Sequence, residues 1–135
     1  MDRRTFLATA AAAATLPTLG TAAVLDYAPG VLEERLAAGD TVMLRFTASW
    51  CSTCAAQERA MTALKAENPA YEAITYIDVD WDTYGRSDLT RDMNIPRRST
   101  LVALKGDVEL GRIIAGTGKS QIKELMDAAL SAATA

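Results

Sequence analysis

The stretch that decides the fold is residues 41–58, which read TVMLRFTASWCSTCAAQE. Its first part, residues 41–47, is a compact apolar run that predicts a buried central strand. Its last part opens a segment rich in Ala, Gln, Glu, Met, Leu and Lys, which predicts a helix from residue 52 to Asn68-Pro69. The two cysteines of the chain therefore lie between a buried strand and the first turn of a helix.

The cysteines are two residues apart, in Trp50-Cys51-Ser52-Thr53-Cys54. A thiolate is the nucleophile in disulfide exchange, and the N–H groups and dipole of a helix N-terminus stabilise it. The spacing lets the second sulfur reach the first within one turn, so that Cys54 can resolve a mixed disulfide on Cys51. A structural disulfide between adjacent turns would constrain very little. We therefore interpret the pair as redox-active.

The rest of the chain alternates between strand and helix patterns. Apolar residues at helical spacing, short apolar runs and Gly-containing turns mark the elements. Helices are expected over residues 29–38, 87–93 and 120–129, and strands over 74–79, 100–104 and 108–114. This order predicts one α/β domain over residues 24–135, in which helices flank a mixed sheet.

The composition excludes several kinds of site. A net charge of −3 over 135 residues provides no basic surface for nucleic acid or for anionic lipid. The absence of histidine excludes Ser-His-Asp and Cys-His catalytic pairs and imidazole metal ligands. Two cysteines cannot form a disulfide scaffold or a four-thiolate site. One alternative that stays open is the binding of a metal such as copper through Cys51 and Cys54, and another is a redox-inert interaction module.

Residues 1–23 have the pattern of a signal peptide. Arg3-Arg4 precede Thr-Phe-Leu, which matches the twin-arginine consensus Arg-Arg-x-Phe-Leu, and an Ala-rich stretch leads to small residues before Val24. The apolar stretch is too short and too weak for a good membrane span. We therefore expect a periplasmic mature protein without a membrane span, exported by the twin-arginine route. A general-secretion signal and an uncleaved anchor are the alternatives.

Residues 24–135 resemble the thioredoxin superfamily, and within it the C-terminal periplasmic domain of the transmembrane thiol reductase DsbD. The resemblance rests on Ala48-Ser49-Trp50-Cys51-x-x-Cys54, Asp78-Val79, Leu89, Met93-Asn94-Ile95 and Thr100-Leu101-Val102. It implies a thioredoxin-like fold, with Cys51 as the attacking and Cys54 as the resolving thiol. It also implies that Trp50, Arg98 and Ser99 contact the substrate.

The same resemblance implies a function. It indicates a thiol–disulfide oxidoreductase without a cofactor, which acts on disulfide-containing proteins and is re-reduced by a membrane donor of the DsbD or CcdA kind. We expect a reductase rather than an oxidase, because Ser52-Thr53 adds neither a histidine nor a cation between the cysteines.

The chain departs from the family first at a charged position. Family members usually carry a buried Asp six residues before the first cysteine as a proton acceptor, and this chain has Arg45 there. The DsbD-like domain has an additional Glu, present here as Glu58, one turn after Cys54 on the same helix face. Glu58 could act as general base for Cys54 or be a solvated helix residue. A buried guanidinium needs a partner, so we expect Arg45 to pair with Glu58 or to favour a nearby thiolate.

The second departure concerns the cis-proline loop that faces the cysteines in the family. Pro96 follows Asn94-Ile95 as it would in that loop, but the ungapped match puts Ser99 at the proline position. A residue other than proline is normally trans and would restore a backbone N–H beside the sulfurs.

Overall fold

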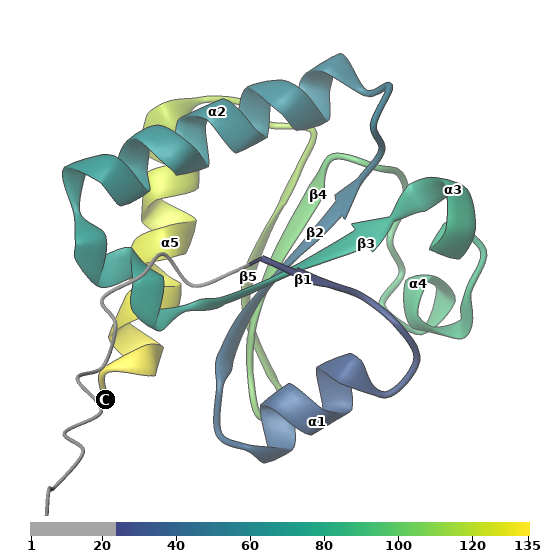
Figure 1. Cartoon of the computed structure of the whole chain (residues 1–135), viewed down its shortest axis with the longest axis horizontal. Coiled ribbons are helices and arrows are strands. Elements are labelled where there is room, and N and C mark those ends of the chain that lie inside the picture. The colour runs from purple at the N-terminus through teal and green to yellow at the C-terminus, as the bar shows by residue number, and fades with distance from the viewer. Residues whose placement is uncertain (1–23) are drawn as a thin grey trace, which may run out of the picture.

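The computed structural model describes residues 24–135, which form a five-stranded sheet with helices on both faces (Figure 1). The strand order is β1-β3-β2-β4-β5. Strands β1, β3 and β2 are parallel, whereas β4 is antiparallel to β2 and β5 is antiparallel to β4. This mixed sheet confirms the predicted fold class. The predicted signal peptide, residues 1–23, lies outside the described residues.

The elements predicted from the sequence are present, with small differences at their ends. Three short elements are not predicted, namely β1, the 3-10 helix η1 and α3, because their two, five and four residues show no clear period. The order is β1 Leu25–Asp26, α1 Val31–Ala37, β2 Thr41–Thr47, α2 Ser52–Glu67, η1 Pro69–Ala73, β3 Thr75–Asp80, α3 Trp81–Tyr84, α4 Asp88–Asp92, β4 Thr100–Lys105, β5 Val108–Ile114 and α5 Lys119–Ala133.

The central strand β2 contributes to an apolar core on each face of the sheet. Met43 belongs to the core under α2 and α5, where it packs with residues such as Met61. Leu44 belongs to the opposite core, together with Leu32 of α1. Because alternate side chains of a strand point to opposite faces, Arg45 projects to the same side as Met43, toward α2. Within residues 24–135, no helix has the length and apolar character needed to cross a membrane.

Arg45 pairs with its register neighbour on β3, Asp78. Arg45 Nε and Nη2 donate to the two carboxylate oxygens of Asp78 at 2.5 and 2.7 Å. Their side chains are only 11% and 24% exposed, so the pair is largely removed from water. The expected ion pair between Arg45 and Glu58 is therefore wrong. The register of two parallel strands, which the sequence does not reveal, puts Asp78 closer.

Removal of the Asp78 charge should destabilise the fold. In Asp78→Asn the guanidinium of Arg45 stays charged and mostly buried without its anion, and the free energy of unfolding should fall by about 2 kcal/mol. Urea denaturation of the reduced protein measures this change. Asp88→Asn, which removes the partner of Arg91 in a highly exposed pair, is the control and should change stability by less than about 0.5 kcal/mol. Equal effects of the two variants would contradict the proposed importance of burial.

Candidate active site

The two cysteines begin helix α2. Cys51 is its N-cap residue, and its sulfur accepts a hydrogen bond of 3.1 Å from the backbone N–H of Cys54. Both cysteines are free thiols and only 4% and 5% exposed. The orphan N–H groups and the dipole of this 16-residue helix act on the Cys51 sulfur, as the sequence predicts.

The hydroxyl of Ser99 lies between the two sulfurs. Ser99 Oγ is 3.1 Å from Cys51 Sγ and 3.1 Å from Cys54 Sγ. The following residue, Thr100, pairs with Phe46 of β2, which brings Ser99 to the end of β2 from which the chain continues to Cys51. The residue that faces the cysteines is therefore Ser99, whereas Pro96 is exposed. Residues 24–135 contain no cis peptide bond, as expected for a non-proline residue at this position.

These contacts lower the pKa of Cys51 from 9.0 to about 7. Burial acts in the opposite direction, because it disfavours the charged thiolate. Hydrogen bonds from the Cys54 thiol, the Ser99 hydroxyl, the Cys54 N–H and the Arg98 side chain outweigh this effect. A large share of Cys51 is therefore ionised at neutral pH.

Exposed Trp50 and half-buried Arg98 form a wall beside Cys51. The Trp50 side chain is 58% exposed, and its indole N–H donates to both carboxylate oxygens of Asp82 at 3.0 Å. The guanidinium carbon of Arg98 lies 4.5 Å from the centre of the Trp50 ring, in a cation–π contact. The structure thus brings together Trp50, Arg98 and Ser99, which the resemblance assigns to substrate contact. It adds Asp82, for which the sequence gives no signal beyond its place in an acidic run.

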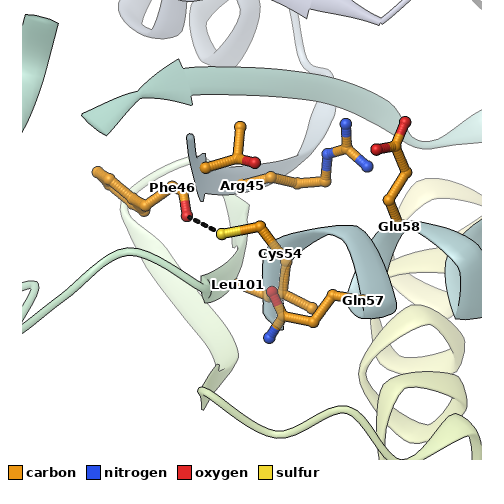
Figure 2. Close-up of a pocket in the computed structure, with 7 residues that line it drawn as sticks. Arg45, Phe46, Cys54, Gln57, Glu58 and Leu101 are labelled. Atoms are coloured by element: carbon orange, nitrogen blue, oxygen red, sulfur yellow. Dashed lines mark hydrogen bonds between the residues drawn. The ribbon is translucent and has the colours of Figure 1, made fainter. Parts of the chain in front are cut away.

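A small pocket lies beneath Cys54, next to Arg45 and Glu58 (Figure 2). Its volume of about 10 Å³ is close to the space that one water molecule needs. Cys54 Sγ points to the carbonyl oxygen of Phe46 at 4.0 Å, and Figure 2 shows the Glu58 carboxylate directed toward the Arg45 guanidinium. Burial lowers the pKa of Arg45, but the hydrogen bond and charge of Asp78 and the charge of Glu58 raise it overall, so Arg45 stays charged.

Gln57 is a site residue that the sequence does not single out. Its side chain is only 3% exposed, and its Nε2 donates to the carbonyl oxygens of Ser99 at 2.8 Å and of Gly116 at 2.9 Å. It lies three residues after Cys54 and therefore on the same face of α2. The one available signal is this spacing, which places a polar side chain on the buried face of the helix.

An open groove of about 240 Å³ gives access to Cys51 from solvent. Acidic side chains from α2 and β3 contribute to its wall. The groove is lined by Thr47, Ala48, Ser49, Cys51, Ala55, Glu58, Asp78 and Asp80. In the part of the chain that the structure describes, no cluster of three or more His, Cys, Asp or Glu side chains is arranged to hold a metal ion.

The family model described as Thioredoxin matches residues 24–128. Three solved structures illustrate the similarity. Trxlp from Edwardsiella tarda EIB202 is 28% identical with a TM-score of 0.66, and the match covers 76% of this chain and 98% of that chain. Thioredoxin from Trypanosoma brucei brucei is 21% identical with a TM-score of 0.64, covering 80% and 91% of the two chains. A cysteine-to-serine mutant of thioredoxin from Entamoeba histolytica is 22% identical with a TM-score of 0.63, covering 78% and 98%. No curated protein sequence matches the chain.

Alkylation by iodoacetamide should report the ionisation of Cys51. In the reduced protein we expect the rate to rise with pH, to be half-maximal near pH 7 and to reach a plateau above it, because only the thiolate reacts. Arg98→Met should move the midpoint to higher pH, whereas Arg91→Met, which removes an exposed cation on α4, should not. A wild-type midpoint near the ordinary thiol value of 9.0 would contradict this prediction.

Proposed function

This chain belongs to the thioredoxin family, and on that premise we propose that Cys51 and Cys54 reduce the disulfide bonds of other proteins. The observation that carries the proposal is the Cys51 thiol at the N-cap of α2, with its pKa lowered to about 7. The same pKa supports reduction rather than oxidation as the direction of the reaction. The pKa of Cys51 is close to that of the nucleophilic cysteine of thioredoxin, which is about 7. It is far from that of the strong oxidant DsbA, which is about 3.5.

The reaction has two steps. The Cys51 thiolate attacks one sulfur of the substrate disulfide, a mixed disulfide forms, and the other substrate sulfur leaves as a thiolate with the electron pair. Cys54 loses its proton and attacks Cys51 Sγ, which releases the second substrate sulfur as a thiolate. The substrate gains two electrons and takes its protons from water, and the protein is left with a Cys51–Cys54 disulfide.

Glu58 is the proposed acceptor of the Cys54 proton. Both residues line the small pocket beneath Cys54, which has the size of one water molecule. Such a water would link the thiol to the carboxylate and make Glu58 the general base of the second step. Arg45, paired with Asp78, keeps a positive charge on the wall of this pocket and would favour the Cys54 thiolate.

The finer assignment follows the resemblance to the C-terminal domain of DsbD. It makes the mature protein a periplasmic reductase of protein disulfides, which a membrane donor of the DsbD or CcdA kind returns to the dithiol state. Trp50 and Arg98 would contact the substrate beside the attacking sulfur, where the Trp50 side chain is 58% exposed. The alternative function from the sequence is copper binding by the two thiols.

The reduction potential of the Cys51–Cys54 couple tests the direction of electron transfer. Equilibration with glutathione or dithiothreitol should give a value near or below roughly −250 mV, and a value near roughly −120 mV would make the protein an oxidant. Cys51→Ser should abolish disulfide reduction, and Cys54→Ser should accumulate a mixed disulfide on Cys51. If the wild-type thiols formed no disulfide and the purified protein held copper, metal binding would replace this proposal.

Export of the full-length chain tests the proposed compartment. Replacement of Arg3 and Arg4 by lysine keeps the positive charge but breaks the twin-arginine consensus. We expect the double variant to accumulate in the cytoplasm as a precursor, whereas the wild-type chain reaches the periplasm. Cell fractionation and the mass of the exported protein measure both results. Unchanged export of the variant would indicate the general secretion route.

A further inference from the structure

The Ser99 hydroxyl contacts both sulfurs that react. Ser99 is completely buried, and its Oγ lies at the same distance, 3.1 Å, from Cys51 Sγ and from Cys54 Sγ. A hydroxyl has one hydrogen to donate and can accept at its lone pairs. It can therefore donate to one sulfur and accept from the other, and rotation about its C–O bond exchanges these roles.

The backbone at Ser99 is fixed in a conformation that proline cannot adopt. Its φ is 64°, in the left-handed region that non-glycine residues rarely occupy, and its N–H donates to the carbonyl oxygen of Phe46 at 2.7 Å. Proline has a φ near about −65° and no N–H. The neighbouring Ala115 also has a positive φ, of 63°, and its N–H donates to the Ser99 carbonyl at 2.9 Å. Such sparsely populated conformations persist where the surrounding structure determines them, and they concentrate at functional sites.

Gln57 connects this loop to the helix that carries the thiols. Its two side-chain hydrogen bonds end on the carbonyl oxygens of Ser99 and Gly116. Gln57 thus holds the loop before β4 and the loop after β5 against helix α2, whose N-cap is Cys51. These hydrogen bonds therefore help to set the distances between the Ser99 hydroxyl and the two sulfurs.

We propose that Ser99 is a catalytic residue whose hydroxyl donates a hydrogen bond first to the Cys51 thiolate and then to the Cys54 thiolate. Gln57 is the positioning residue that keeps this hydroxyl between the two sulfurs. This proposal rests on the proposed disulfide reduction. It says that the attack by Cys51 and the attack by Cys54 use the same hydrogen-bond donor, the Ser99 hydroxyl.

In the reduced protein, Ser99 donates to the Cys51 thiolate, and the single hydrogen of the Cys54 thiol is shared between that thiolate and the Ser99 oxygen. After the first attack the Cys51 sulfur is part of a mixed disulfide and carries no charge, so it no longer competes for the hydrogen. The hydroxyl rotates and donates to Cys54 as that thiol loses its proton to the general base. Ser99 keeps its own proton throughout, and the bonds formed and broken are those of the two steps above.

The charged groups near Cys51 belong to other residues, so a replacement of Ser99 changes none of them chemically. They come from the loop before β4, from α2 and from β3, and are Arg98, Glu58, Asp78 and Asp80. Ser99→Ala removes the hydroxyl, and Ser99→Gly also removes it while accepting the positive φ without strain. A comparison of these two variants with the wild-type protein therefore isolates the hydrogen bond from backbone strain.

The first measurement is the rate of Cys51 alkylation, located by mass spectrometry, over a range of pH. Hydrogen bonds to charged groups are strong enough that both Ser99 variants should react about tenfold more slowly at pH 7, with the midpoint at higher pH. The mixed disulfide with a small aromatic disulfide such as Ellman's reagent should also decay about tenfold more slowly. Thr62→Ala, which removes an exposed hydroxyl farther along α2, is the matched control and should change neither rate appreciably.

A double-mutant cycle tests the role of Gln57. Gln57→Met keeps the length of the side chain and removes its hydrogen bonds, and it should slow both reactions in the wild-type background. In Ser99→Ala it should have no further effect, because a residue that acts through Ser99 is then uncoupled from the sulfurs. An equal effect in both backgrounds would show that Gln57 does not act through Ser99.

Thermal melting accompanies each variant. If Ser99→Ala or Ser99→Gly melts as the wild-type protein does and shows wild-type alkylation and decay rates, the proposal is wrong. Should the wild-type thiols fail to form a disulfide, disulfide reduction would be wrong, and the alkylation rates would still decide whether Ser99 stabilises the Cys51 thiolate.

Discussion

The active site depends on the hydrogen-bonded register of β2 between β3 and β4. The register with β3 puts Arg45 beside Asp78, and the register with β4 puts Phe46 opposite Thr100. The first pairing gives the cation beneath Cys54 its counter-ion. The second brings Ser99 to the end of β2, within reach of both sulfurs. A slip of β2 by one residue would turn Arg45 to the face away from α2 and would separate these groups.

The charge beneath Cys54 has the opposite sign from the one that the family pattern leads us to expect. A carboxylate at this position could accept the Cys54 proton directly, whereas the guanidinium of Arg45 cannot. The base that we propose for the second step comes from another element, because the carboxylate of Glu58 lines the same pocket from α2. The bidentate pair with Asp78 keeps Arg45 ionised and in place, so the exchange of a carboxylate for a cation changes the source of the base without leaving a buried charge unpaired.

Local sequence patterns predict the helices and strands of the fold, but they do not predict the contacts between these elements. The apolar run of residues 41–47 and the Cys51–Cys54 spacing depend on neighbours in the chain, so the sequence predicts β2, the start of α2 and the place of Cys51 at the beginning of that helix. The partner of Arg45 depends on strand register and was predicted wrongly. Gln57 was missed for a similar reason, because its two acceptors are backbone carbonyls from distant loops, and a carbonyl leaves no trace in the residue type.

The loop at Ser99 is fixed in a different way from the cis-proline loop of the family. A proline ring fixes a loop by restricting its own backbone, whereas here the backbone is fixed by the hydrogen bonds that it makes to Phe46, Ala115 and Gln57. A proline would lack the N–H that donates to Phe46 and could not adopt the positive φ of this position. The loop is consequently held by the strand and the helix that also position the sulfurs. The hydroxyl that reaches both thiols is held by that arrangement at a fully buried position between them.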